Sequence, residues 1–176
     1  MSTSFAATPG RSPAPASERT REDPERLIRL LRDSDSATRT LAAWRGCPVR
    51  IELVSRREDV ATVAELTELE TSSQQPVQRR EVRLLDAGDR VLSEASAVVV
   101  LVRLPHGTAR ALQDGDVPLG LLLAPLHPRR HTLSVVRLQP SPGADHDLLF
   151  EITARLDVGG RPTALVRERY RAEALS

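Results

Sequence analysis

Apolar side chains first recur at the spacing of a helix near residue 24. Pro24 stands where a helix could begin. Proline suits the first turn of a helix, because it lacks the backbone N–H that would have no partner within the helix at that position. An apolar stripe at helical spacing follows it: Leu27, Ile28, Leu30 and Leu31. A second helix is expected next, capped by Asp35 or Ser36 and running to about Arg45, where Gly46 ends it. The pattern therefore predicts two amphipathic helices that each bury one face.

Farther along the chain, apolar and polar residues alternate with a period of two, which predicts strands. Turn-forming residues separate several of them, at residues 86–89 and 159–160. Residues 57–70 are ambiguous, because their apolar residues at intervals of three favour a short helix or a covered turn. Short helices are also expected at residues 108–113 and after Pro118. The predicted strands fall at residues 49–53, 78–84, 91–102, 132–138, 149–158 and 163–170.

Early helices followed by hairpin-connected strands predict one α+β domain. We expect a sheet of about six strands, mainly antiparallel, with helices packed on one face. Residues 1–20 are rich in Ser, Ala, Pro and Thr, and they offer little apolar surface to offset the entropy of ordering. They are therefore expected to form a disordered tail, and the domain would occupy residues 21–176.

Composition narrows the possible classes of function. Hydrophobic residues make up 40% of the 176 residues and aromatic residues 2%, so the core must be aliphatic. The chain contains Arg but no Lys, and its net charge of +1 argues against a general nucleic-acid binder. Cys47 is the single cysteine, which excludes an intramolecular disulfide and a Cys-based zinc cluster. No apolar run approaches the roughly 18 residues of a membrane span, so we expect a cytoplasmic protein without a membrane partner.

Two charged residues fall on strand positions that should face the core. Arg80 alternates in phase with Val82 and Leu84, whereas the residues between them are charged. On the last strand, Glu168 shares a face with Val166. Buried charges are costly unless they are paired or hydrogen-bonded. Two interpretations stay open: the two residues pair with each other or reach the sheet edge, or they lie at opposite ends of an enclosed pocket and bind a ligand.

Five short motifs occur in order along residues 36–170. They are Ala-Thr-Arg-Thr-Leu at 37–41, Arg-Glu-Val-Arg-Leu at 80–84, Ala-Ser-Ala-Val-Val at 95–99 with Arg-Leu-Pro at 103–105, Pro-Leu-Gly at 118–120, and Gly-Arg-Pro at 160–162 followed by Glu168. This set resembles the chorismate pyruvate-lyases, or 4-hydroxybenzoate synthases. The family has Thr before its catalytic Glu, where this chain has Arg167. The resemblance implies a chorismate lyase-like fold.

The same resemblance implies an enzyme that eliminates pyruvate from chorismate to give 4-hydroxybenzoate, with no metal or organic cofactor. Arg80 would clamp the ring carboxylate, and Glu168 would act on the ether oxygen as the C–O bond breaks. The backbone at Leu119 and Gly120 would contact the ligand carboxylate. Ala37 would line the flap over the pocket.

Two other functions remain open. One is a non-catalytic domain of the same fold that binds a small molecule such as an aromatic acid. The other is a related enzyme for another enolpyruvyl or aromatic substrate, as in secondary metabolism. In transcription regulators such domains follow a winged helix, and the roughly 35 residues ahead of this domain are too few for one. The expected partner is therefore a small molecule and not nucleic acid, and no pattern indicates an oligomeric state.

The remaining polar candidates are expected to be structural. His127 and His131 are spaced by four residues, but Pro128 between them breaks any helix, so no metal site is expected. Arg129 and Arg130 are expected to be solvated, where they could at most guide an anionic ligand.

Overall fold

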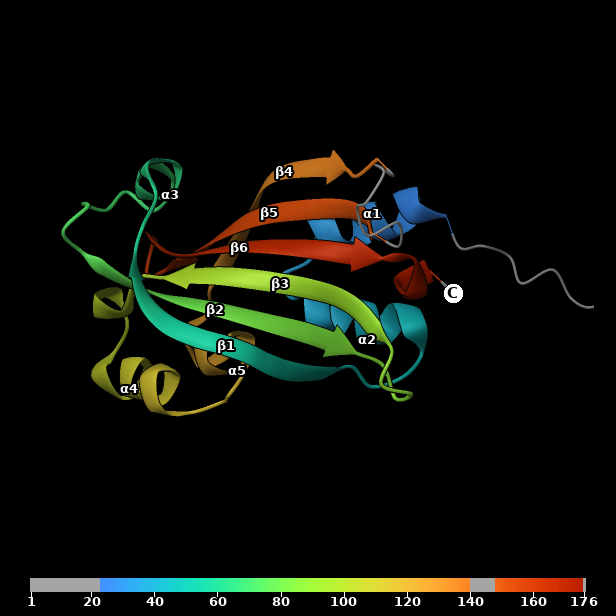
Figure 1. Cartoon of the computed structure of the whole chain (residues 1–176), viewed down its shortest axis with the longest axis horizontal. Coiled ribbons are helices and arrows are strands. Elements are labelled where there is room, and N and C mark those ends of the chain that lie inside the picture. The colour runs from blue at the N-terminus through green and yellow to red at the C-terminus, as the bar shows by residue number, and fades with distance from the viewer. Residues whose placement is uncertain (1–22, 140–147, 176) are drawn as a thin grey trace, which may run out of the picture.

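The computed structural model describes residues 23–139 and 148–175, which build a six-stranded antiparallel sheet in the order β1-β2-β3-β6-β5-β4 (Figure 1). The predicted tail at residues 1–20 lies outside the described residues, and the domain boundary stays a prediction. The predicted fold class is confirmed. The strands are β1 (Arg50–Val60), β2 (Pro76–Leu85), β3 (Val91–Val99), β4 (Arg129–Arg137), β5 (Leu148–Val158) and β6 (Arg161–Arg171).

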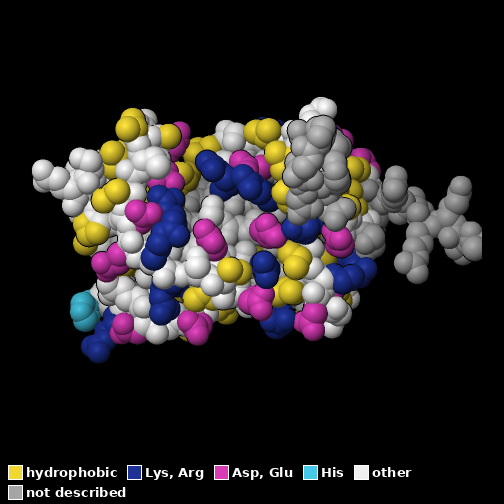
Figure 2. All heavy atoms as spheres, in the orientation of Figure 1, with side chains coloured by type: hydrophobic (Ala, Val, Ile, Leu, Met, Phe, Trp, Pro, Cys, Tyr) yellow, Lys and Arg dark blue, Asp and Glu magenta, His cyan; other side chains and the backbone are white. Residues whose placement is uncertain are grey.

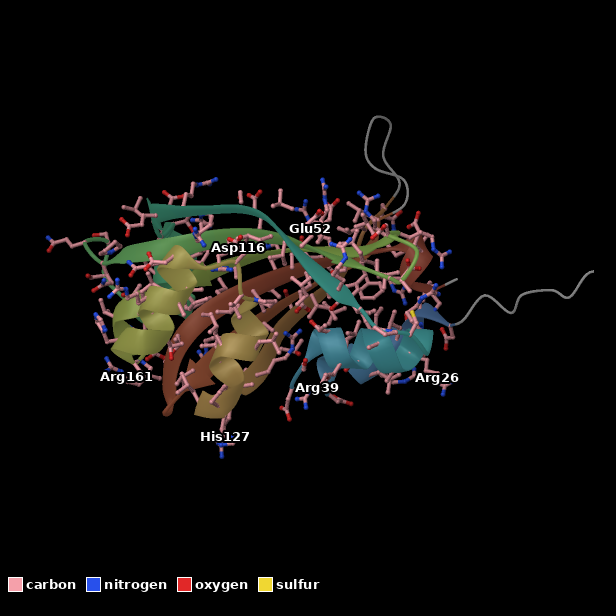
Figure 3. All side chains as sticks on the ribbon, turned by 90° about the horizontal axis from the view of Figure 1, so that it is seen from below. Arg26, Arg39, Glu52, Asp116, His127 and Arg161 are labelled. Carbon is pink, nitrogen blue, oxygen red and sulfur yellow. The ribbon has the colours of Figure 1, made fainter. Side chains whose placement is uncertain are left out.

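Two pairs of helices cover one face of the sheet, which we call the inner face, and Figure 3 shows both pairs on the same side. The opposite, outer face is mostly open, apart from a short helix packed at one end. The helices are α1 (Pro24–Arg32), α2 (Ala37–Arg45), α3 (Val63–Glu68), α4 (His106–Asp114) and α5 (Leu119–Leu123), with 3-10 turns η1 (Leu101–Arg103), η2 (Ala124–Leu126) and η3 (Ala172–Leu175). None of the helices in the described part of the chain is long and apolar enough to cross a membrane.

The apolar side chains gather into separate cores. The first core lies under α1 and α2, and its buried members are Leu27, Ile28, Leu31, Ala37, Leu41, Leu84, Leu92, Phe150, Ile152, Tyr170 and Ala174. The second core lies under α4 and α5, and its buried members are Val99, Leu104, Leu112, Leu123, Ala154, Leu156, Ala164 and Val166. A third, smaller core on the outer face contains Ala61, Leu69, Val77, Val98, Val100 and Leu165. As the composition required, these cores are almost entirely aliphatic.

Local signals explain where the first two helices begin and end. Asp23 accepts a hydrogen bond from the Glu25 N–H ahead of α1. Of the two residues that could cap α2, Ser36 does so, since its side chain accepts from the Arg39 N–H. Gly46 ends α2 at a φ of 64°, a left-handed conformation that glycine adopts without strain.

Several strand boundaries differ from the prediction, including the ends of β1 and β3. The expected strand at residues 91–102 ends at Val99, and a 3-10 turn follows it. In the ambiguous region 57–70, β1 continues to Val60 before the six-residue helix α3 begins. The polar end of β1 is held because it pairs along its length with β2, which no local alternation could reveal.

Candidate functional site

A polar zone separates the first core from the second on the inner face. Along β6, Val166 belongs to the second core and Tyr170 to the first, and Glu168 lies between them. Glu168 is 8% exposed and Arg80 on β2 is 2% exposed, which confirms that both side chains are buried. Arg130 on β4 joins them with a side chain only 4% exposed. We call Arg80, Arg130 and Glu168 the inner polar seam.

Arg80 and Glu168 do not pair with each other. On β3, Ala97 lies opposite Arg80 and Ala95 lies opposite Glu168, so one whole strand separates the two charged residues. Two strand spacings place their backbones roughly 10 Å apart across the sheet. Each charge therefore finds its partners elsewhere.

Arg80 is held by Gln78 on its own strand and by backbone carbonyls from the last turn of α4 and from the chain that follows α4. Its Nη1 donates to the Leu112 carbonyl at 2.9 Å and to Gln78 Oε1 at 3.3 Å. Its Nη2 donates to the Val117 carbonyl at 3.0 Å. Its Nε is buried and has no hydrogen-bond partner among the described residues. The guanidinium is thus bound by neutral oxygens only.

No carboxylate in the described part of the chain forms a salt bridge with Arg80, although the group is deeply buried. Burial lowers the pKa of the Arg80 guanidinium, and the nearby charge of Arg56 lowers it further, whereas Asp116 acts in the opposite direction. The Asp116 side chain is 85% exposed, so water screens its charge. Arg80 is therefore a buried cation without a buried counter-ion.

Glu168 has the opposite environment, because Arg130 neutralises it. Arg130 Nη1 and Nη2 donate to the two Glu168 carboxylate oxygens at 3.1 and 2.8 Å, which is the bidentate geometry of a strong ion pair. The Tyr170 hydroxyl donates to the same carboxylate at 2.8 Å, and its ring stacks on Phe150. Burial, followed by the charge of Glu168, raises the pKa of the Tyr170 hydroxyl. Burial lowers the pKa of Arg130, and Glu168 outweighs that effect to raise it.

The expectation that Arg130 is solvated is wrong. The predicted strand began at residue 132, which left Arg130 outside any alternation pattern. In the structure β4 begins at Arg129, and Arg130 lies opposite Leu156 of the buried β5 face. A strand extended by three residues would have put Arg130 in phase with Thr132 and on the inner face.

The other predicted ligand contacts divide between the two helix pairs. Leu119 is half-buried against the second core, and Gly120 is exposed, with no described atom within 4 Å of where a Cβ would stand. Both follow closely after Val117, so the fold brings them near Arg80. Ala37 is buried in the first core at the start of α2, with the other helix pair. Their roles in binding stay predictions.

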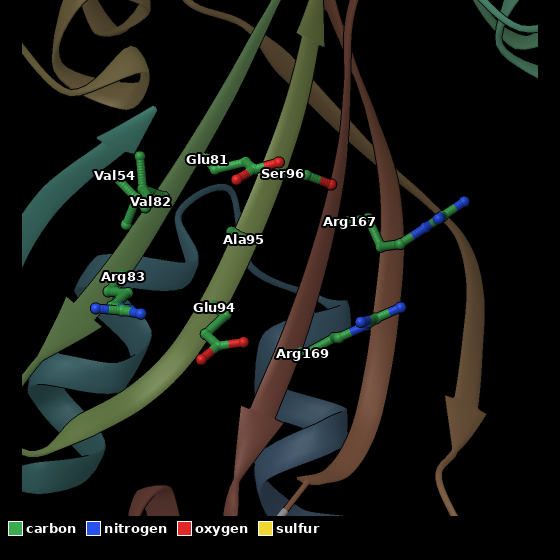
Figure 4. Close-up of a pocket in the computed structure, with 9 residues that line it drawn as sticks. All are labelled: Val54, Glu81, Val82, Arg83, Glu94, Ala95, Ser96, Arg167 and Arg169. Carbon is green, nitrogen blue, oxygen red and sulfur yellow. The ribbon is translucent and has the colours of Figure 1, made fainter. Parts of the chain in front are cut away.

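The outer face carries a separate, shallow hollow. Figure 2 shows this face with basic and acidic side chains interspersed, and Figure 4 shows the residues around the hollow. Its volume is about 310 Å³, and Arg167 lies there, 3.4 Å from Glu151, instead of beside Glu168 in the seam. A second hollow of about 100 Å³ lies at the edge near Pro76. Neither hollow includes Arg80 or Glu168.

Within residues 23–139 and 148–175, no group of three or more His, Cys, Asp or Glu side chains is arranged to hold a metal ion. The sequence matches no protein-family model and no curated protein. The structure, in contrast, is similar to several solved structures.

One similar structure is the effector domain of PhnF from Mycobacterium smegmatis, with a TM-score of 0.62 and 18% identity over 78% of this chain and 89% of that one. PhnF itself gives a TM-score of 0.63 and 17% identity over 81% of this chain, which spans 66% of the length of PhnF. The C-terminal domain of the histidine utilization repressor from Pseudomonas syringae gives a TM-score of 0.52 and 11% identity, over 72% of this chain and 93% of that one. At these identities the likeness establishes the fold. It is the chorismate lyase-like fold of effector domains from transcriptional regulators.

The expectation of a lyase acting on chorismate is wrong. The similar structures described above come from transcriptional regulators, whose effector domains are not enzymes. A regulator also acts on nucleic acid, so these similarities give no support to the expectation that excludes nucleic acid as a partner.

Proposed function

We propose that this chain is a non-catalytic small-molecule-binding domain whose ligand is an organic anion such as an aromatic acid. The observation that carries the proposal is Arg80, a guanidinium 2% exposed with no salt-bridge partner among the described residues. Similar structures support it, because they include an effector domain from Mycobacterium smegmatis and a ligand-binding domain of a regulator from Bordetella bronchiseptica.

An anionic ligand would relieve the cost of burying this charge. Neutral carbonyl oxygens compensate a buried cation only in part, whereas a carboxylate matches the guanidinium fork in both charge and geometry. Arg56 lies close by, but Asp116 pairs with it at 3.5 Å. Leu119 and Gly120 lie on the chain beside Arg80 and would contact the ligand through their backbone.

Glu168 and Ala37 would then form the boundary of the ligand site on the side away from Arg80. With Arg130 as its ion-pair partner, Glu168 contributes no net charge, so it would not repel an anion at Arg80. Ala37 starts α2 on the first core and would limit the site toward that helix pair. In this arrangement Arg80 alone supplies the net charge that binds the ligand.

Benzoate and benzamide test this proposal, since they have nearly the same shape and differ in charge. We expect benzoate to bind the whole chain in calorimetry and raise its melting temperature, and benzamide to do neither. Arg80→Gln should weaken benzoate binding at least about tenfold, because it removes one partner of a buried charge pair. Arg110→Gln on α4 is the matched control, with a side chain 74% exposed, and it should bind as the wild type does.

Three outcomes would count against the proposal. Equal binding of benzoate and benzamide would contradict an anion site. Equal benzoate affinity in folded Arg80→Gln, checked by circular dichroism, would remove Arg80 from the site. If inorganic phosphate binds and benzoate does not, the site is an anion site, but its ligand is not an aromatic acid.

A further inference from the structure

The chain between α4 and α5 is held to the sheet by side chains from two strands. Arg80 binds the carbonyls of Leu112 and Val117, and Gln78 Nε2 donates to the Leu112 carbonyl at 3.1 Å. From β1, Arg56 Nη1 donates to the Gly115 carbonyl. We call residues 112–117 the α4–α5 junction; Figure 3 labels Asp116 within it, where the chain passes close to the sheet.

The junction uses the same Arg80 atoms that a ligand would need. Nη1 and Nη2 are both engaged by junction carbonyls, and only the buried Nε is without a partner. A carboxylate that binds end-on to Nη1 and Nη2 competes with these carbonyls. Because Arg80 is only 2% exposed, a ligand reaches the guanidinium only where the groups that cover it move. The exchange gives the buried guanidinium a counter-charge, which the neutral carbonyl oxygens do not supply.

We propose that the α4–α5 junction is a clasp that the anionic group of the ligand opens by replacing the Leu112 and Val117 carbonyls on Arg80. This inference rests on the proposed function and adds the regulation of the same site. The side chains of Leu112 and Leu123 are buried in the second core, so we expect the opening to move the backbone of the junction and to leave the helix pair in place. Ligand binding would thus move the junction, and a partner protein that contacts this surface could detect the change.

Coupling of this kind works in both directions. If the ligand must displace the junction, then a change that loosens the junction must raise the affinity for the ligand. Gly115 offers such a change without altering charge. A Cβ at Gly115 would lie 2.9 Å from the Ala111 carbonyl oxygen, so the backbone must shift. Gly107 on α4 is the matched control, because a Cβ there would meet no described atom within 4 Å.

The experiment combines benzoate titration with hydrogen exchange on the whole chain. Gly115→Ala should bind benzoate at least about fivefold more tightly than the wild type, and Gly107→Ala should bind with unchanged affinity. In the wild type, saturating benzoate should speed exchange in peptides covering residues 109–122. That second measurement needs no variant, so it stands even where Gly115→Ala fails to fold.

The outcomes separate this inference from the proposed function. Benzoate binding with unchanged or slower exchange at residues 109–122 would overturn the clasp and leave the anion site in place. Equal affinities of folded Gly115→Ala and wild type would do the same. If neither benzoate nor inorganic phosphate binds any of the three proteins, the anion site itself is absent, and the clasp fails with it.

Discussion

Two buried arginines in this fold, Arg80 and Arg130, have partners of different charge. Arg130 has a carboxylate partner from β6, whereas Arg80 has only backbone carbonyls and Gln78. A fully paired charge contributes to a fixed structure, and a charge bound by neutral groups retains affinity for an anion. Arginine therefore stabilises the fold at position 130 and, in our proposal, binds the ligand at position 80.

The Arg130–Glu168 pair predicts a large loss of stability when it is broken. Glu168→Gln leaves the Arg130 guanidinium buried without a counter-charge, and this should lower the free energy of unfolding by about 3 kcal/mol. Urea denaturation measures the change. The control is Arg169→Gln on the same strand, because Arg169 is 50% exposed and pairs with Glu151 at the surface. It should change stability by less than about 0.5 kcal/mol, and an equal loss in both variants would contradict the assignment.

Strand alternation was enough to predict the burial of Arg80 and Glu168. Period-two arguments say which face a side chain takes, but not what it meets there. The partners of Arg80 come from Leu112 and Val117, more than thirty residues away in sequence. Arg130 was missed because the start of β4 has no apolar signal. Long-range partners such as these depend on tertiary packing, which the sequence pattern does not contain.

At the scale of elements, Arg79 joins β2 to α3 and β1. It donates to both Glu65 carboxylate oxygens, at 2.8 and 3.0 Å, and to Asp59 at 3.0 Å. Glu65 also completes the capping box of α3 with Thr62. The hydrogen bonds from Arg79 lower the pKa of Glu65 from 4.5 to about 2.

This lowered pKa predicts how stability depends on pH. Because the folded pKa of Glu65 lies below the unfolded value of 4.5, its ionised form stabilises the fold above about pH 4.5. That contribution is lost as the pH falls toward about 2. Glu65→Gln keeps the cap and removes the charge, so the difference in unfolding free energy from the wild type should shrink across this range.

Urea melts at several pH values measure that difference. Glu52→Gln is the control, because Glu52 is 44% exposed and lies 4.0 Å from Arg83. Its difference from the wild type should stay small at every pH. A Glu65→Gln difference that does not vary between pH 4.5 and 2 would show that the pair with Arg79 does not lower this pKa.

Element boundaries depended on pairing and on long-range anchors. The apolar run after β3 was predicted to continue as strand to residue 102, but η1 turns the chain at Leu101. Arg103 holds this turn, since its guanidinium donates to the carbonyls of Leu69, Glu70 and Pro162. Hydrophobicity alone cannot distinguish a buried strand from a buried turn.

At the scale of the whole molecule, the seam divides the inner face into two cores. Ile152→Val in the first core should lower the free energy of unfolding by about 1 kcal/mol, and Leu123→Ala in the second by about 3 kcal/mol. Because the two sites share no core, the double variant should lose the sum, within about 0.5 kcal/mol. Urea unfolding of the four proteins measures this, and a larger departure from the sum would mean that the cores act as one.

Sequence alone predicted a mainly antiparallel sheet of about six strands with helices packed on one face, and the structure confirms it. Hairpin turns linked β2 to β3 and β5 to β6, which fixed those neighbours. The pairing of β3 with β6 joins strands far apart in the chain, and no local signal predicts it. The family resemblance implied this fold correctly and the enzymatic activity wrongly, because one fold supports many functions.

The position of β6 bears on how the chain folds during synthesis. It follows every other strand in the chain, yet it lies in the middle of the sheet, between β3 and β5. Until residues 161–171 have left the ribosome, the nascent protein holds two partial sheets whose facing edges are open to other chains. Aggregation and chaperone contact should therefore decrease once β6 has paired with β3 and β5, because this one strand closes the whole sheet.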